Sequence, residues 1–429
     1  MASRFKLSEA GRAGVFASFA ASRYFDPAGL ARQWPFSQWL HAAPVGAGGS
    51  CRSFSREDFV RDANETALIQ SGQLPSGASE ISVRIEDRRF GPVGTSEFPG
   101  DEILVNGMPW PRLDCERRLY RLRLFNDADS RVFTLGFGLE NFSGIRLRFW
   151  QIGTDLGLMD RPVPLTSLTL APGERADVLV DFSKVVGWWH GRVIMTNDAC
   201  TPFPVGLPPL VGRTDRVMAF SIAGPHSLAD LFGAGLALFG DAGVPSCLRP
   251  KDPLPPIDTA GATVRKLMVF DGSDAGGRLQ TLLGTVNPAP GNPAGPGFGT
   301  FLQADPVTEH IAAGSTEIWE IYNTSADAHS IHLQRGDFRV LDREPFSGTL
   351  LAKPTGSGEA VGGYLTDIVL TGLRTPAQPH EQGRKDTVLA YPGEVTRIVA
   401  RFERPGEYLW HRHGLSGKDR DTMRRFIVA

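Results

Sequence analysis

The sequence predicts an all-β protein built of β-sandwiches, and three observations predict it. Gly and Pro are frequent, with 49 and 32 copies, or about 19% of the 429 residues against a usual roughly 12%. Several runs alternate apolar and polar residues with the two-residue period of a strand. No stretch keeps a helical apolar period over three turns with capping residues at both ends. Short strands joined by many turns account for all three.

Three alternating runs are the clearest predicted strands. Residues 119–125 read Leu-Tyr-Arg-Leu-Arg-Leu-Phe, which puts Arg121 and Arg123 on the same face of a strand. Residues 317–322 and 395–402 alternate in the same way. A strand of this kind is expected to have one face in the core and the other in solvent.

An internal repeat connects the two halves of the chain. Residues 172–174 and residues 392–394 both read Pro-Gly-Glu, and an apolar strand and a Phe follow each in the same register. Upstream, an alternating strand ends in Asn126 in one half and in Asn323 in the other. Two units built on one plan predict two β-sandwiches of similar topology.

The repeat and the composition predict the domain boundaries. We place the two complete units at residues 93–243 and 262–429, joined by a Pro-rich linker at residues 244–261. Residues 1–92 precede them. The first 75 of these fit no clear pattern and are too few for a further complete sandwich of about 100 residues.

Charge and hydropathy narrow the classes of partner. A formal net charge of −2 gives no support to nucleic acid or to an anionic membrane surface. No apolar run approaches the roughly 18 residues of a membrane helix, so no membrane span is expected. Residues 1–22 weakly resemble a targeting peptide, with Arg4, Lys6 and Arg12 before an Ala-rich run. An ordinary or disordered N-terminus is the favoured interpretation.

The four cysteines lack the paired spacing of a zinc site. Cys200 and Cys247 lie at the end of one predicted unit and the start of the linker, where a disulfide could fix the linker. Four scattered cysteines in a chain of this size are usually thiols. The sequence leaves both interpretations open and slightly favours thiols.

Four of the nine histidines form two tight clusters, His329 with His332 and His411 with His413. Residues 411 and 413 on one strand point to the same face, which suits two ligands of one metal ion. Imidazole is a good ligand for Zn, Cu, Fe and Ni. From spacing alone, structural or surface histidines are the default interpretation and metal binding is the alternative.

Several motifs resemble those of the multicopper oxidases. Residues 329–333 (His-Ser-Ile-His-Leu) and 408–413 (Tyr-Leu-Trp-His-Arg-His) resemble motifs of the third domain in that family. Residues 103–107 and 170–177 resemble the middle domain, most closely in the bilirubin oxidase and spore-coat laccase branch. The resemblance runs in order through residues 60–429.

This resemblance implies tandem cupredoxin (plastocyanin-like) domains with Greek-key topology. Two would be complete, and residues 1–92 would hold a remnant of the first domain and its link. Oxidases of the family take single electrons from phenols, bilins or metal ions at a type 1 copper. They pass them to a three-copper cluster that reduces dioxygen to water. Ten His, one Cys and usually one Met hold the four coppers.

When the family's ligands are carried over by position, the resemblance implies that four copper-ligand positions keep a histidine. These are His329 at the type 1 site, His332 at the type 2 site, and His411 and His413 at the type 3 site. The type 1 cysteine falls on Arg412. Other ligand positions of this domain are also changed: a type 1 His falls on Gly417, the axial Met on Thr422 and a type 3 His on Gln334. Residues 1–75 contain one histidine, His41, and no His-x-His motif of the first domain.

Arg412 is the most consequential of these changes. A blue-copper site depends on a Cu–thiolate bond, and a guanidinium has donors but no acceptor with which to ligate a cation. Two unit positive charges 4 Å apart also repel by about 4 kcal/mol at an effective dielectric constant near 20. An acidic residue that relays protons in the laccase branch falls on Lys418. Laccase-type oxidation coupled to dioxygen reduction is therefore not expected.

Three hypotheses follow for function. The favoured one is a copper-poor or copper-free homologue that serves as a binding or scaffold protein. The first alternative is a repurposed enzyme for an aromatic or phenolic compound, with at most one metal at His332, His411 and His413. The second is a truncated oxidase, for which oxidoreductase activity is the family expectation although the ligand set argues against it. Copper and no metal both stay open, as do a small aromatic molecule and a protein as partner. The family weakly favours a periplasmic or secreted protein.

Overall fold

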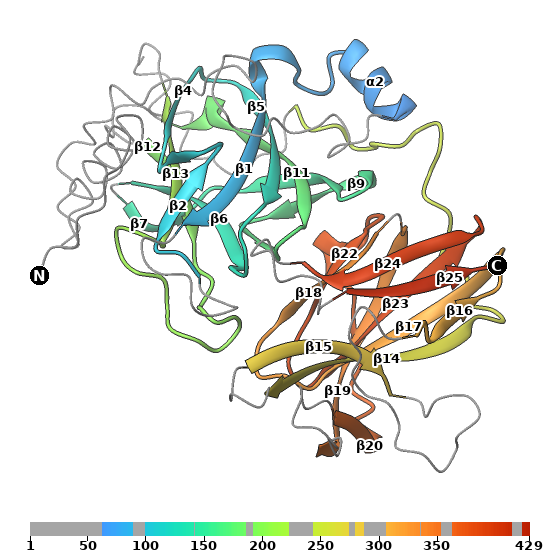
Figure 1. Ribbon diagram of the computed structural model, residues 1–429. Helices are drawn as coiled ribbons and strands as arrows, with labels where there is room; N and C mark the ends of the chain where they lie inside the picture. Colours follow the sequence, from blue (N-terminus) through green and yellow to red (C-terminus); the bar gives the residue numbers. More distant parts are fainter. Residues whose placement is uncertain are drawn as a thin grey trace, which may run out of the picture.

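The computed structural model describes residues 62–88, 99–140, 142–185, 192–222, 243–273, 279–286, 306–334, 336–352, 363–413 and 423–429. These residues form two β-sandwich units, blue to green and yellow to red in Figure 1, with a short helix α2 (Ala63–Gln70) beside the first. The predicted all-β cupredoxin-type fold is confirmed. Most of the proposed first-domain remnant, including residues 1–22, lies outside the described residues.

In the described residues, two sheets make up the first unit. Its strands are β1 (Glu80–Arg88), β2 (Glu102–Val105), β3 (Met108–Pro109), β4 (Arg112–Cys115), β5 (Leu119–Asn126), β6 (Phe133–Leu139), β7 (Phe142–Arg146), β8 (Phe149–Thr154), β9 (Gly157–Leu165), β10 (Ser167–Leu170), β11 (Arg175–Asp181), β12 (Arg192–Asn197) and β13 (Arg216–Ile222). One sheet has the order β3-β2-β1-β5-β11-β8-β9. The other has the order β10-β6-β12-β13-β4, and β7 pairs with β6.

The second unit repeats this two-sheet plan over its described residues. Its strands are β14 (Thr263–Ser273), β15 (Leu279–Thr285), β16 (Glu309–Ile311), β17 (Ser315–Asn323), β18 (His329–Leu333), β19 (Phe338–Ala352), β20 (Gly363–Leu370), β21 (Thr375–Pro376), β22 (Thr387–Ala390), β23 (Glu394–Phe402), β24 (Gly406–Arg412) and β25 (Met423–Val428). The orders are β15-β14-β17-β23-β19-β20, with β21 on β19, and β16-β25-β24-β18-β22.

The predicted internal repeat is present in both topology and side-chain contacts. β5 lies between parallel β1 and antiparallel β11, as β17 lies between β14 and β23. Asn126 donates to the carbonyls of Arg131 and Leu170, and its own backbone carbonyl accepts from Gly173 N at 2.8 Å. Asn323 donates to Asp327 and Ala390 and accepts from Gly393 N at 2.9 Å. Each Asn therefore fastens the Pro-Gly-Glu turn of its own unit.

The prediction that one face of residues 119–125 is exposed to solvent is wrong, because Arg121 and Arg123 are buried. Helix α2 covers this face and brings Glu65, whose carboxylate pairs with both guanidinium groups. Asp177 on the neighbouring β11 binds Arg121 as well. These carboxylates offset the positive charges, so a strand with arginines along one face is buried on both sides.

The domain boundaries remain predictions, and the structure adds two observations on them. Strand β1 lies before residue 93, yet it pairs with β2 and β5 inside the first unit. The linker packs on the first unit, where Leu248 N and Leu254 N donate to Asp160.

The described cysteines are free thiols: Cys115, Cys200 and Cys247. The preference for thiols over a Cys200–Cys247 disulfide is confirmed, and Cys51 lies outside the described residues. Among the residues that the structure describes, no helix is long and apolar enough to span a membrane.

Candidate metal centre

Two neighbouring strands of the second unit bring three histidines together. β18 and β24 run antiparallel, and their register places His332 directly opposite His411. His413 follows the end of β24, and its backbone N–H donates to the carbonyl of Ser330 at 2.9 Å. This bond keeps residue 413 beside β18, so its ring lies on the same side as the other two. We call His332, His411 and His413 the histidine triad.

The triad rings are close enough to share one ion. One ligand atom from each lies within 4.8 Å of the others, and ring centroids are 4.8 to 6.0 Å apart. His411 Nδ1 lies 3.0 Å from the backbone carbonyl of Arg412, which can only accept, so Nδ1 carries the proton. In a neutral ring this leaves a lone pair on His411 Nε2, 2.9 Å from His332 Nδ1.

Two histidines of the triad, His332 and His413, are held in the neutral form that metals bind. Burial lowers the pKa of His332 to about 3, helped by the charges of His411 and Arg175. Burial also lowers the pKa of His413 to about 3, with further contributions from His332 and His411. Near neutral pH both imidazoles are therefore uncharged. A metal ion does not have to displace a proton from a histidinium cation in order to bind.

The residues present fit a copper or zinc ion. Three imidazoles are a common donor set for both metals, and His413 Nε2 is buried without a hydrogen-bond partner in the described structure. Two nitrogens bound to one ion at about 2.0–2.1 Å lie roughly 3.3 Å apart in tetrahedral geometry. The distances between ring nitrogens in the triad bracket this value. The pair His332 Nδ1 and His411 Nε2 is 2.9 Å apart, and all three ligand atoms lie within 4.8 Å of one another. Small ring rotations would close the set around an ion.

The first unit forms one wall of the triad. Gly173, in the Pro-Gly-Glu turn, has a φ of +84°, and a Cβ there would come within 2.8 Å of His413 Cγ. Next to it, Arg175 binds Asp386 of the second unit through both carboxylate oxygens, at 2.8 and 2.5 Å. Asp386 Oδ2 lies 3.9 Å from His332 Nε2. The geometry of the triad therefore depends on how the two units dock.

A buried ionic cluster fixes that docking. Lys385 Nζ of the second unit lies 3.0 Å from Asp155 and 3.2 Å from Glu174, both in the first unit. Asp155 also accepts from the backbone N–H groups of Arg175 and Asp386, at 2.8 and 3.2 Å. The Asp155 carboxylate thus binds backbone groups of both units, next to residues that contact the triad.

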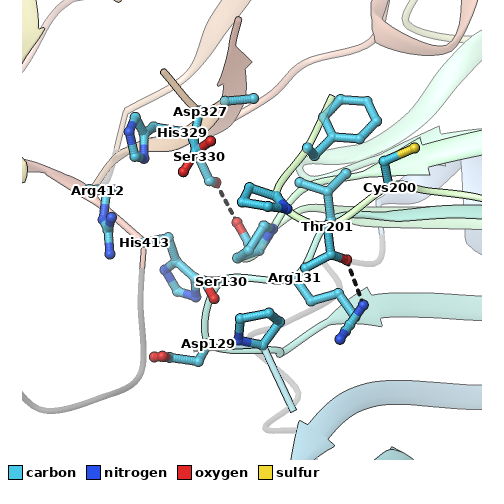
Figure 2. Close-up of a pocket in the computed structure, with 16 residues that line it drawn as sticks. Asp129, Ser130, Arg131, Cys200, Thr201, Asp327, His329, Ser330, Arg412 and His413 are labelled. Carbon is cyan, nitrogen blue, oxygen red and sulfur yellow. Dashed lines mark hydrogen bonds between the residues drawn. The ribbon is translucent and has the colours of Figure 1, made fainter. Parts of the chain in front are cut away.

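His329 and Arg412 lie apart from the triad, beside a cleft between the two units (Figure 2). His329 is 4% exposed, and burial lowers its pKa to about 4. Its Nε2 is 3.9 Å from Asp271 Oδ1, beyond hydrogen-bond distance. Arg412 donates to Thr281 Oγ1 at 3.4 Å. The structure therefore brings together three of the four predicted ligand residues and leaves His329 outside the group.

Of the other positions to which the resemblance assigns a site role, only some lie in the described residues. Gln334 is exposed, and its backbone N–H donates to the carbonyl of Leu409. Gly417, Lys418 and Thr422 lie outside the described residues. Sequence reasoning missed the triad contacts of Gly173, Arg175 and Asp386. The Pro-Gly-Glu repeat marked that turn, but nothing in the pattern indicated that it faces histidines of the other unit.

Comparisons with known proteins find multicopper oxidases and laccases among the proteins similar to this chain. A family model described as multicopper oxidase matches residues 282–429, which include the triad. A laccase of Bacillus stratosphericus is 34% identical over 85% of this chain and 66% of its own length. A laccase of Bacillus subtilis is 33% identical over 86% of this chain and 66% of its length. The chain thus spans just under two thirds of these relatives. The crystal structure of a multicopper oxidase from Aquifex aeolicus superimposes with a TM-score of 0.61, at 26% identity, covering 86% of this chain and 70% of that one.

Proposed function

The chain belongs to the multicopper oxidase family, and from this premise we propose that it is a copper-poor member. It keeps the cupredoxin-type scaffold and binds at most one metal ion, copper or zinc, at the histidine triad. It does not perform laccase-type oxidation coupled to dioxygen reduction. The observation that carries the proposal is the convergence of His332, His411 and His413, with Arg412 between two of them.

Arg412 separates this chain from a four-copper oxidase. It occupies the position of the type 1 cysteine, where the family needs a thiolate both to bind copper and to conduct electrons. A guanidinium offers no lone pair at neutral pH and adds a positive charge. Its donation to Thr281 Oγ1 at 3.4 Å gives it a contact of its own within the fold. Electron entry through a type 1 copper is therefore absent from the proposed activity.

The triad itself performs a more limited role. His411 is oriented by its hydrogen bond to a backbone carbonyl, which directs the lone pair of its Nε2 inward. Burial keeps His332 and His413 neutral, and the turn at Gly173 packs against the ring of His413. A copper or zinc ion bound there would supply Lewis acidity toward an oxygen ligand.

Metal analysis of the purified full chain tests the proposal. After dialysis with Cu²⁺ or Zn²⁺ and removal of free ion, we expect about one ion per chain and no intense blue thiolate-to-copper absorption. His411→Ala should lose the ion. The matched control is His310→Ala, because His310 is exposed and lies outside the triad.

Two results would contradict the proposal. Stoichiometric binding of four coppers with dioxygen consumption would restore the oxidase interpretation. Equal metal content in His411→Ala and in the unsubstituted chain would place the ion elsewhere. A chain that binds no ion but unfolds cooperatively is the pure scaffold of our first hypothesis, whereas a decayed sequence should unfold without cooperativity. A small aromatic molecule or a protein as partner, and a periplasmic or secreted location, are kept as proposals.

A further inference from the structure

The two ring nitrogens of His332 face different groups of the protein. Its Nδ1 lies 2.9 Å from Nε2 of His411, and its Nε2 lies 3.9 Å from Oδ2 of Asp386. Asp386 comes just before β22, whose Thr387 is paired with His332 on β18. Within a neutral imidazole only one nitrogen carries a proton. The position of that proton therefore decides whether the lone pair of His332 points to the triad or to the carboxylate.

Hydrogen bonding within the triad fixes this position when no ion is bound. His411 donates from Nδ1 to the backbone carbonyl of Arg412, so its Nε2 accepts. The partner at 2.9 Å, Nδ1 of His332, is then the donor. This leaves His332 Nε2 without a proton, opposite a carboxylate oxygen that also only accepts. Two acceptors repel each other, which accounts for a separation of 3.9 Å where a hydrogen bond would span about 2.9 Å.

Ligation through the triad requires the other tautomer of His332. An imidazole nitrogen that ligates an ion carries no proton, and the close nitrogen pair of the triad includes Nδ1 of His332. The proton of the neutral ring then resides on Nε2, which becomes a donor. Asp386 Oδ2 lies on this side of the ring. A contact between two acceptors thereby becomes a contact between a donor and an acceptor.

Asp386 is held in place by both units. Its backbone carbonyl accepts from Leu333 N at 2.8 Å, and its Oδ1 accepts from Thr387 Oγ1 at 2.8 Å. Arg175 on β11 of the first unit donates to both carboxylate oxygens. Among the described residues, Oδ2 accepts a hydrogen bond from Arg175 alone, so it keeps a lone pair for a further donor. The oxygen that faces His332 is therefore both fixed in position and able to accept.

We propose that Asp386 is a positioning residue of the metal centre and that Arg175 of the first unit holds it in that role. Asp386 accepts from the protonated Nε2 of His332, which presents the lone pair of Nδ1 to the ion. The Nδ1–H bond breaks and an Nε2–H bond forms by exchange with water, so the charge of the ring is unchanged. This inference rests on the proposed function and deepens it. Because Arg175 belongs to the first unit, contact between the units regulates metal affinity.

NMR spectra of the full chain with isotopically labelled histidine test the tautomer directly. In the metal-free chain we expect the proton of His332 on Nδ1. After addition of Zn²⁺, which is diamagnetic, we expect it on Nε2. The signals of His332 are identified by their loss in His332→Ala.

Metal affinities of variants test the two residues, by competition with a chelator for Zn²⁺ or Cu²⁺. Asp386→Asn keeps the size of the side chain but removes its charge, and should weaken binding about 10- to 100-fold. Arg175→Gln should also weaken binding. Because Arg175 acts through Asp386, the double variant should bind no more weakly than the weaker single variant, whereas two independent structural losses would add. Asp337→Asn is the matched control, because it removes a carboxylate from the surface pair of Arg384 and Asp337, in which 42% of each side chain is exposed.

The outcomes distinguish this inference from the proposed function. Far-ultraviolet circular dichroism first establishes that each variant is folded, and the NMR test on the unsubstituted chain decides the matter if a variant is not. If the unsubstituted chain binds no ion, the metal centre is refuted and this inference with it. If an ion binds but the proton of His332 stays on Nδ1, or Asp386→Asn binds as tightly as Asp337→Asn, only the role of Asp386 is overturned. Additive losses in the double variant overturn the role of Arg175.

Discussion

Gly173 of the first unit lies against the imidazole of His413 in the second, so closely that a Cβ on residue 173 would meet His413 Cγ at 2.8 Å. Its backbone N–H is bound by the carbonyl of Asn126, which holds the turn in place. The contact makes a backbone turn of one unit part of the wall of the metal centre in the other. Metal affinity should therefore respond to a substitution at a residue that is distant in sequence from every ligand.

Gly173→Ala is the direct test of this contact. The substitution places a side chain at a φ of +84°, which costs about 1–3 kcal/mol in conformational strain, and pushes the His413 ring out of position. We expect the free energy of unfolding to fall by that amount and the affinity for Cu²⁺ or Zn²⁺ to fall at least tenfold. Urea denaturation and competition with a chelator measure the two effects.

The internal repeat supplies a matched control, Gly393→Ala. Gly393 occupies the equivalent turn with a φ of +71°, but no atom lies within 4 Å of a Cβ built there. It should lose similar stability and keep its metal affinity. If both variants bind metal equally well, the Gly173 wall does not position His413.

Acidification should destabilise the metal-free chain. Burial lowers the pKa of His329 and His380 to about 4, and that of His332 and His413 to about 3, whereas an unfolded chain protonates histidine near 6.5. Because the unfolded state takes up protons first, stability is fully present above about pH 6.5 and is lost as pH falls toward 3. Each group contributes up to about 1.4 kcal/mol per pH unit in that window. Urea midpoints between pH 7.5 and 5 measure the slope, and a flat profile would contradict buried neutral histidines.

Glu174 acts in the opposite direction over part of this range. Burial raises its pKa to about 7, against the attraction of Lys385, while the unfolded chain releases this proton near 4.5. Its contribution is present below about pH 4.5 and is lost as pH rises through 7. Glu174→Gln mimics the protonated side chain and removes the pH-dependent contribution of Glu174 to stability. The variant should therefore show a steeper loss of stability on acidification than the unsubstituted chain, by up to about 1.4 kcal/mol per pH unit.

Much of the fold follows from local sequence pattern. Strand alternation in residues 119–125 and the two Pro-Gly-Glu turns are local signals, and the structure places them in equivalent positions of two similar units. The burial of Arg121 could not be predicted, because it depends on Glu65 in a helix 56 residues away. Pairing of distant charges leaves no periodic trace in a sequence.

The candidate site shows the same division. His411 and His413 share a face by strand geometry alone, and the motif resemblance adds His332. Gly173, Arg175 and Asp386 reach the triad only because the two units dock, and docking rests on single residues at the boundary, among them Lys385. His329 carries a metal-ligand motif but lies outside the triad, since a motif specifies chain position and not the distance between rings.

The two repeat asparagines should be equally important for stability. Each buried side chain donates to two backbone carbonyls and accepts a backbone N–H, from Ala128 in one unit and from Ser325 in the other. Asn126→Ala removes the partner of three backbone groups, and Asn323→Ala removes the partner of three backbone groups and of Ser325 Oγ. About 2–4 kcal/mol of stability should be lost in either case. Denaturation curves check this. If only one variant loses less than 1 kcal/mol of stability, the two asparagines are not equivalent in the two units.

Lys385 is a buried cation at the contact between the two units. Its ammonium group is buried between Asp155 and Glu174 of the first unit, 3.0 and 3.2 Å away. Lys385→Met keeps the aliphatic length but leaves two buried carboxylates without their counter-charge. We expect about 3–5 kcal/mol of destabilisation. Because β22 and the triad wall lose their alignment together, metal affinity should fall as well.

The neighbouring residue gives the control, since Arg384 pairs with Asp337 while 42% of its side chain is exposed. Arg384→Met should cost less than about 1 kcal/mol. The double variant Lys385→Met/Glu174→Gln removes one of the stranded charges, so it should recover part of the lost stability and of the metal affinity. If it is no more stable than Lys385→Met, the cost arises from packing of the lysine chain and not from uncompensated charge. In that case the docking of the two units is steric, whereas the pH response assigned to Glu174, which arises from burial, would remain.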